Sequence, residues 1–341
     1  MLKKIFLKKF LRYGIPLIIS FGLCYLLFTG IDFNEMIETI RNECNFWWIG
    51  LALVLSVFSH IFRAMRWRIL LRALKINAPL STVVYSVFGT DAVNLVFPRL
   101  GEIWRTSYIA HRQKASFTTV FGSMLADRLA DGLMVLLLTF VAFIWASGAI
   151  SKYLSQNAKN YDKFLEFISS PWLWVVIVAI VAILWWLFTK KRDNKIISGI
   201  IDIIKGLWTG FIAIFKMKGK WTWVLLSFAI WGCYFSQLFV TFFAFEETTA
   251  VFEKNGIIVV LVCFVLSSIA MGVPSNGGIG PWQWAVIFGL SIYGMSQKGG
   301  ISLAFANLVL GSQTLLIIGL GIYTFIAVTL EKKKLKESSP N

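Results

Sequence analysis

The sequence predicts an all-α, polytopic membrane protein in which residues 1–341 form a single integral membrane domain. The chain is 57% hydrophobic, with 30 Phe and 15 Trp, and its mean hydropathy is +0.73, well beyond the values of soluble globular proteins. It also contains uncharged runs that approach or exceed the roughly 20 residues that a helix needs to cross about 30 Å of hydrocarbon. These runs are Tyr13–Ile31, Cys44–Phe62, Gly132–Ser151, Phe167–Thr189, Trp221–Phe245, Asn255–Gln297 and Gly299–Leu330.

The net charge of +16 is distributed unevenly along the chain. This is the positive-inside pattern, and it predicts a protein of the inner (cytoplasmic) membrane with both termini in the cytosol. The excess charge then anchors the protein to anionic lipids and does not indicate nucleic-acid binding. Basic residues gather in 2–13, 63–75, 99–114, 190–220 and 331–341, whereas 32–43, 152–166 and 246–254 hold few of them and most of the acidic residues.

Both termini on one side require an even number of crossings, and we expect about eight. Residues Leu80–Phe97 are apolar but have basic segments on both sides, so they are predicted to form a re-entrant hairpin. The run Asn255–Gln297 is too long for one helix and is expected to hold one span and a second broken segment. Whether Trp282–Gln297 spans or re-enters is left open. Residues Ile196–Phe215, with Lys-rich flanks, are predicted to form an in-plane amphipathic helix.

Helix-breaking residues interrupt two apolar segments. The first break directly follows Leu80–Phe97, and the second lies within Asn255–Gln297. Within a bilayer, such backbone is tolerated only where it is buried in protein or lines a cavity. Transporters often place paired broken helices at the substrate, because the helix ends present unpaired N–H and C=O groups to it. We therefore expect Asn276 and Gln283, beside the second break, to contact substrate. The predicted hinges are Pro98 and Gly101 in the first break and Pro274, Gly277, Gly278 and Gly280 in the second.

Polar and charged residues gather around the first break. Asn94 precedes it, and Glu102 and Arg105 share a helix face after it. We expect Arg99 and Arg105 to contact a lipid phosphate, because the guanidinium fork binds phosphate oxygens bidentately. Glu102 would orient one of these guanidinium groups. The alternative is an ordinary interfacial Glu–Arg pair at the end of a hairpin.

Asp127, Arg128 and Asp131 lie within the next predicted span. If that helix begins near Phe117, the two aspartates lie about 15 and 21 Å along it, where an unpaired charge costs several kcal/mol. The aspartates are four residues apart and face one way, and Arg128 is expected to reach an acid on an adjacent segment. The alternative is a buried structural salt bridge that locks helices together.

The remaining candidates favour structural roles. Arg66 and Trp67 are most simply an interfacial belt, with the arginine reaching toward headgroups. His60, one turn deeper, is more typical of a helix–helix hydrogen bond than of a proton carrier. The four cysteines and two histidines have no metal or disulfide spacing, so we expect no metal and no cofactor.

These motifs resemble the flippase-like membrane domain family typified by the membrane part of bacterial lysylphosphatidylglycerol synthases. The resemblance extends over nearly the whole chain, and Arg66-Trp67 is similar to an Arg-Trp pair of that family. Two features depart from the family: Gln283 replaces a late acid, and the chain ends without the soluble domain that modifies the lipid. The matching positions are Asn94, Pro98, Gly101, Glu102 and Arg105; Asp127, Arg128, Leu129 and Asp131; and Pro274, Gly277, Gly278 and Gly280.

The resemblance implies translocation without synthesis. We expect a non-enzymatic lipid flippase that moves the headgroup of a phospholipid or polyprenyl phosphate through a charged intramembrane cavity. Membrane lipids are its expected partners, and a homodimer is left open. The sequence contains no ATPase motif, so transport would be passive, ion-coupled or downhill. The alternatives are an enzyme acting on a lipid-linked sugar, with Asp127 and Asp131 as metal-binding carboxylates, and a membrane scaffold for a soluble enzyme.

Overall fold

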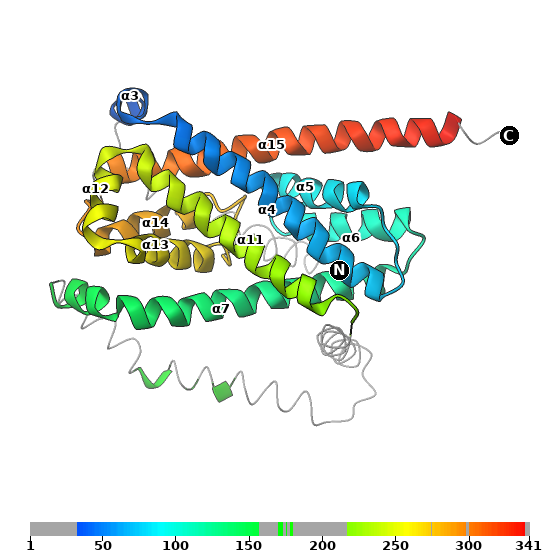
Figure 1. Ribbon diagram of the computed structural model, residues 1–341, viewed down its shortest axis with the longest axis horizontal. Helices are drawn as coiled ribbons and strands as arrows, with labels where there is room; N and C mark the ends of the chain where they lie inside the picture. Colours follow the sequence, from blue (N-terminus) through cyan, green and yellow to red (C-terminus); the bar gives the residue numbers. More distant parts are fainter. Residues whose placement is uncertain are drawn as a thin grey trace, which may run out of the picture.

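The computed structural model describes residues 33–156, 170–172, 175, 178–179, 217–273, 275–297 and 300–337. Every regular element within these residues is a helix, which confirms the predicted fold class. Four long helices run along the long axis of the molecule (Figure 1). They are α4 (Phe46–Ala73), α7 (Phe117–Gln156), α11 (Lys220–Thr241), which continues into the 3-10 turn η2 (Phe242–Ala244), and α15 (Gly300–Glu337).

The four long helices contain stretches long and apolar enough to cross a membrane. At 1.5 Å per residue, the 28 residues of α4 extend about 42 Å, more than the hydrocarbon thickness of about 30 Å. These stretches confirm four of the predicted crossings. They are Phe46–Ala73, Phe117–Ala149, Lys220–Ala244 and Gly300–Glu331.

Two hairpins of shorter helices lie among the long ones. The first consists of α5 (Leu80–Val96) and α6 (Gly101–Arg112), and the second of α13 (Ile257–Ala270) and α14 (Pro281–Ile292). The 17 residues of α5 reach about 26 Å and the 14 of α13 about 21 Å, so neither helix crosses 30 Å of hydrocarbon along the normal. The hairpins enter from opposite ends of the bundle, and their connecting loops meet near its middle (Figure 1).

The expected count of eight crossings is not confirmed. Where one span and a broken segment were expected in Asn255–Gln297, α13 and α14 instead form the second hairpin. A sharp bend of 110° separates α13 from α12 (Glu246–Asn255), and counting that pair as one span gives at most five spans in the described part of the chain. Two predicted crossings, in Tyr13–Ile31 and at Pro171–Thr189, and the amphipathic helix predicted at Ile196–Phe215 fall partly or wholly outside the described residues.

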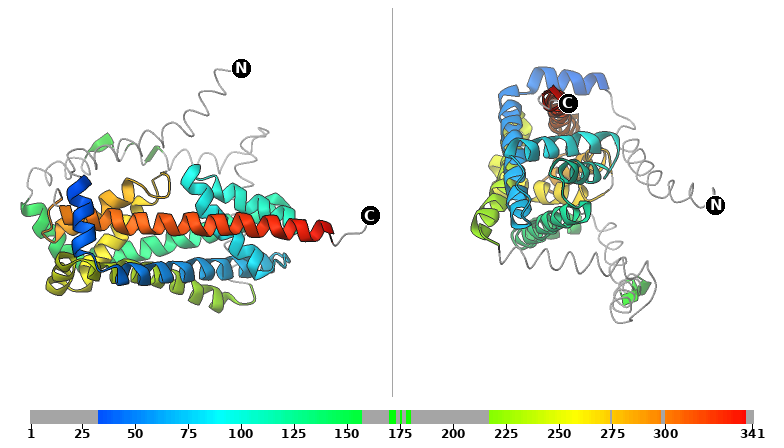
Figure 2. Two further views of the ribbon diagram at one scale, coloured as in Figure 1. Left: turned by 90° about the horizontal axis from the view of Figure 1, so that it is seen from above. Right: turned by 90° about the vertical axis from the view of Figure 1, so that its right-hand side faces the viewer.

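The two ends of the bundle carry the charge groups that the sequence separates. At one end, α3 (Phe33–Glu43) lies across the bundle (Figure 2), and the Asn45 N–H donates to the Ala244 carbonyl over 2.8 Å, which ties α4 to the segment before α12. At the other end, Arg112 of α6 forms an ion pair with Glu331 of α15. Among the described residues, the basic segments 63–75, 99–114 and 331–337 thus lie at the end opposite to the acidic segments 33–43 and 246–254, as the charge pattern predicts. That the basic end is cytosolic stays a prediction.

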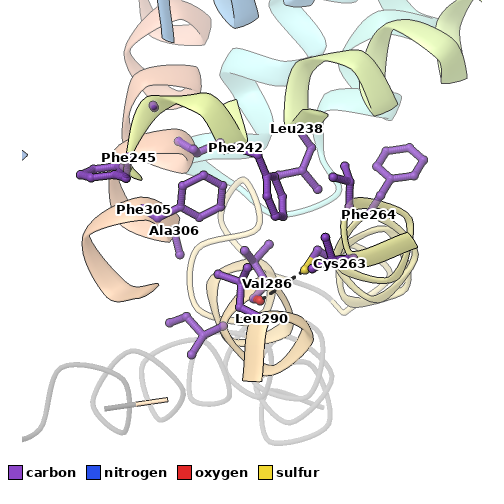
Figure 3. Packing of buried hydrophobic residues seen from close by; sticks show 14 of the residues in the cluster. Leu238, Phe242, Phe245, Cys263, Phe264, Val286, Leu290, Phe305 and Ala306 are labelled. Carbon is purple, nitrogen blue, oxygen red and sulfur yellow. Dashed lines mark hydrogen bonds between the residues drawn. The ribbon is translucent and has the colours of Figure 1, made fainter. Parts of the chain in front are cut away.

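The second hairpin is anchored in an apolar core that it shares with α11 and α15 (Figure 3). Phe242 and Phe305 pack edge to face with their ring centroids 5.4 Å apart, beside the fully buried Leu290. A Cβ atom at Gly289 would lie 2.7 Å from Sγ of Cys263. The glycine therefore allows α13 and α14 to pack closely, which holds the hairpin in a fixed position.

Candidate functional site

The first predicted break is the turn between α5 and α6. The Gly101 N–H donates to Oδ1 of Asn94 over 2.8 Å, so Asn94 satisfies one of the open donors at the start of α6. A Cβ atom at Gly101 would lie only 2.1 Å from the Thr90 carbonyl oxygen. Arg99 has a φ of 66°, a left-handed conformation that reverses the chain at the cost of backbone strain. Pro98 precedes it in the same turn.

The second predicted break, residues 271–280, connects α13 to α14. Gly277, Gly278 and Gly280 have φ values of 64°, 90° and 92°, a region that residues with a Cβ rarely adopt. Gln283 accepts from the Gly280 N–H over 2.8 Å and donates to Oδ1 of Asn307 over 2.5 Å. The neutral amide therefore joins the tip of the hairpin to α15.

Of two further residues predicted in the second break, the structure describes Asn276 but not Pro274. Asn276 has a buried Oδ1 without a hydrogen-bond partner among the described residues, so an acceptor remains open at the tip. Pro274 lies outside the described residues, and its predicted hinge role stays a prediction.

The tips of the two hairpins touch. Nη2 of Arg99 donates to the Gly272 carbonyl over 2.7 Å and approaches the Met271 carbonyl at 3.4 Å. These carbonyls follow the end of α13, where the helix dipole favours a cation. On the other side of the contact, a Cβ atom at Gly277 would lie 2.4 Å from Cδ2 of Leu95. Segments about 170 residues apart in sequence thus form one junction, with the exposed Arg99 at its surface.

A buried ion cluster lies beside this junction. Nε of Arg66, on α4, lies 2.8 Å from Oδ1 of Asp127 on α7, and Nη2 lies 2.7 Å from Oδ1 of Asp131. Nη1 of Arg66 approaches the hydroxyl of Ser227 on α11 at 3.3 Å. The side chains of Arg66 and Asp127 are 0% and 1% accessible. Both aspartates face one way, as predicted, and together they bind one arginine.

The interpretation of Arg66 and Trp67 as an interfacial belt was wrong. Both are fully buried, and the Trp67 Nε1–H donates to the Ser123 hydroxyl on α7 over 3.1 Å. The spacing of His60, Arg63 and Arg66 was the available signal, because residues three apart share a helix face. Three cationic or titratable groups on one face require acids opposite them if that face is buried.

A second, more accessible ion pair lies next to the first. Nη2 of Arg128, on α7, lies 2.9 Å from Oε1 of Glu102 on α6, and its Nη1 lies 3.8 Å from Oδ2 of Asp131. Nδ2 of Asn94 approaches the other Glu102 oxygen at 3.4 Å. The side chains of Arg128 and Glu102 are 32% and 13% accessible. Arg128 thus reaches an acid on an adjacent segment, as predicted, and this acid is Glu102.

The expected pairing of Glu102 with Arg99 or Arg105 was wrong. Arg105 is buried and stacks on the indole of Trp67, with its Cζ 4.3 Å from the ring centroid. Its Nε and Nη2 have no hydrogen-bond partner among the described residues. Arg105 is thus a buried cation with open donors, and it could contact a phosphate only if the hairpin moved.

A neighbouring cluster contains His60, in the contact between helices expected of it, together with Asp91 and Arg63, to which the sequence analysis gave no partners. Nδ1 of His60 lies 3.2 Å from Oδ2 of Asp91 on α5, and Nη1 of Arg63 lies 3.7 Å from Oδ1 of the same carboxylate. Arg63 also donates to the hydroxyl of Tyr234 on α11. Nothing local in the sequence indicates that Asp91 has its partners on α4.

No group of three or more His, Cys, Asp or Glu residues in the described part of the chain is arranged to hold a metal ion. Asp127 and Asp131, the carboxylates considered for a metal, both face Arg66. Cys44 lies outside the spanning helices, and burial raises the pKa of its thiol to about 11. It therefore stays protonated at neutral pH.

Comparison with known families matches residues 14–321 to the family described as the lysylphosphatidylglycerol synthase TM region. The matched range contains both hairpins and every residue of the ion clusters. Neither the curated proteins nor the solved structures include a significant match to this chain.

Proposed function

Because the chain belongs to the family of the lysylphosphatidylglycerol synthase transmembrane region, we propose that it moves the phosphate-bearing headgroup of a membrane lipid between the two leaflets. The acyl or prenyl tails would stay in the hydrocarbon while the headgroup passes the ion clusters. Phospholipids and polyprenyl phosphates share this chemistry.

One observation carries the proposal: two broken hairpins from opposite ends of the bundle meet beside a group of charged side chains. An unpaired charge at the centre of a bilayer costs at least about 2.5–3.5 kcal/mol, so its presence calls for a partner or a function. The side chains of Arg66 and Asp127 are buried, and this ion pair has a structural role in the site. Arg128 and Glu102 are accessible, which makes them the part of the site that a headgroup can reach.

The geometry suggests an exchange of anions. A phosphate can take the place of Glu102 on Arg128, because the guanidinium fork binds carboxylate and phosphate oxygens alike. Arg128 then remains paired throughout, whereas the displaced Glu102 carboxylate loses its cation. The displaced Glu102 keeps its contact with Asn94. Arg99 at the tip junction offers the headgroup a second cation, at the surface of the molecule.

Purified protein in phosphatidylcholine vesicles with a trace of phosphatidylglycerol, labelled on one acyl chain with a reducible fluorophore, tests the proposal. Addition of dithionite outside the vesicles reports how fast the label crosses. We expect Arg128→Ala to slow the transfer at least about tenfold, the equivalent of about 1.4 kcal/mol. The matched control is Arg72→Ala, an exposed arginine in the last turn of α4, which should transfer lipid at close to the wild-type rate.

Two further measurements separate a folding defect from a loss of function. The size-exclusion profiles and melting curves of the variants must match those of the wild type. A further variant, Arg128→Lys, keeps the positive charge but removes the bidentate fork of the guanidinium. A labelled lipid with an uncharged sugar headgroup and no phosphate should cross no faster than in protein-free vesicles. Wild-type rates in both folded Arg128→Ala and folded Glu102→Gln would overturn the proposal.

A further inference from the structure

We propose that His60 and Asp91 form a proton-binding site, so that one proton moves together with each anionic headgroup. This inference rests on the proposed function and adds the source of energy to it. It concerns the side chains that the anion exchange at Arg128 does not use.

The pair joins the long helix α4 to the first hairpin. His60 lies on α4 and Asp91 on α5 of the first hairpin, with Nδ1 and Oδ2 3.2 Å apart. His60 is 7% exposed, and its ring meets the edge of Phe88 at 6.0 Å between centroids. Histidine is the side chain that most readily changes its charge between pH 5 and 8. A proton on His60 therefore alters the attachment of the hairpin to the long helix.

Arg63 competes with His60 for the same carboxylate. Its Nη1 lies 3.7 Å from Oδ1 of Asp91, and its guanidinium also donates to Tyr234 on α11. With His60 neutral, Arg63 supplies the countercharge of Asp91. With His60 protonated, the closer imidazolium supplies it, and Arg63 is released toward Tyr234. The proton thus changes which cation holds α5.

Further charged groups near the pair come from α7 and, with Arg105, from α6. The positive charge of Arg128 interacts favourably with the carboxylate of Asp91. The carboxylates of Asp127 and Asp131 interact favourably with the guanidinium of Arg63. The long helix α15 also packs on α4 and α5, but its sequence has no charged residue before Glu331, which pairs with Arg112 at the end of the bundle.

The charge balance of the clusters explains why proton and anion would travel together. In the described part of the chain, these clusters contain as many arginines as carboxylates, so with a neutral His60 they carry no net charge. An anionic headgroup adds one negative charge in a medium where uncompensated charge is costly, and a proton on His60 restores neutrality. These groups are Arg63, Arg66, Arg105 and Arg128, and Asp91, Glu102, Asp127 and Asp131.

A short path connects the proton site to the headgroup site. Asp91 and Asn94 are three residues apart on α5 and share a face. Asn94 in turn contacts Glu102 and the N–H of Gly101. A shift of α5 on protonation of His60 therefore acts directly on the carboxylate that the phosphate must displace. Binding of the proton and of the headgroup are therefore linked. The factor by which a proton on His60 raises the affinity for the headgroup equals the factor by which the headgroup raises the affinity for the proton.

Vesicles with an imposed pH gradient test the coupling, with the membrane potential held at zero by potassium and valinomycin. A gradient of about one pH unit is worth about 1.4 kcal/mol per proton and should bias the final distribution of labelled phosphatidylglycerol roughly tenfold. His60→Gln can still donate to Asp91 but cannot take up a proton, so it should move lipid without this bias. His111→Gln is the matched control, because His111 is the second of two histidines and is exposed on α6.

A second measurement does not depend on lipid transfer. In His111→Gln protein labelled with ¹⁵N-histidine, the NMR signals report His60 alone. We record them from pH 5 to 8 and expect a change of protonation state that differs in Asp91→Asn. A His60 that keeps one protonation state over this range overturns the proton site. Lipid transfer that ignores the pH gradient overturns the coupling. If no lipid moves in the wild type under any gradient, the proposed function fails, and the NMR titration still decides whether the proton site exists.

Discussion

Removal of the Arg66 guanidinium should destabilise this protein more than the loss of any exposed charge. In Arg66→Ala, the carboxylates of Asp127 and Asp131 lose the cation that lies 2.8 and 2.7 Å from them. Asp127 is 1% accessible, so water cannot replace the lost partner. Breaking a buried ion pair from one side costs about 3–5 kcal/mol, and Asp131 then retains only the more distant Nη1 of Arg128, 3.8 Å from its Oδ2.

The free energy of unfolding, measured by titrating a denaturing detergent into mixed micelles, checks this value. Arg72→Ala on the same helix is exposed and should change it by less than about 0.5 kcal/mol. The triple variant Arg66→Met, Asp127→Leu, Asp131→Leu removes all three charges and should recover most of the loss, because apolar replacement of a whole buried ion cluster is often neutral or stabilising. If Arg66→Ala unfolds like Arg72→Ala, the cluster is not a closed, dry ion pair and the reasoning fails.

Two further substitutions test the hairpin tips. Gly101→Ala should destabilise the protein by about 3 kcal/mol, the upper range for overpacking, because its Cβ would lie 2.1 Å from the Thr90 carbonyl; Gly122→Ala, with nothing within 4 Å of an added Cβ, should be neutral or stabilising by up to about 1 kcal/mol. Equal melting temperatures for these two alanine variants would show that α5 and α6 are not in close contact. Gln283→Leu removes the acceptor of the Gly280 N–H and should cost about 1–3 kcal/mol, with faster amide exchange at the second tip; unchanged exchange at residues 275–280 would contradict this.

The sequence predicted which charged residues share a helix face but did not predict their ion-pair partners. That Asp127 and Asp131 share a face follows from helical geometry alone, because residues four apart lie on one side. Their partner is Arg66, more than 60 residues earlier on another helix. Any of several arginines satisfies the requirement that a buried acid be paired, so only the packing of α4 against α7 selects one of them. The same reason explains why Glu102 was assigned to neighbours in sequence although it binds Arg128.

Hydrophobic length, charge sidedness and Pro–Gly breaks are local properties that act within a few turns of chain, so the residues alone predict a helical membrane protein with two broken segments. The second hairpin of α13 and α14, the contact of Arg99 with the Gly272 carbonyl and the burial of Arg66 follow only from the tertiary packing. These features depend on contacts between distant segments. Their free energy comes from groups that are excluded from water and lipid together, and no single helix contains both partners.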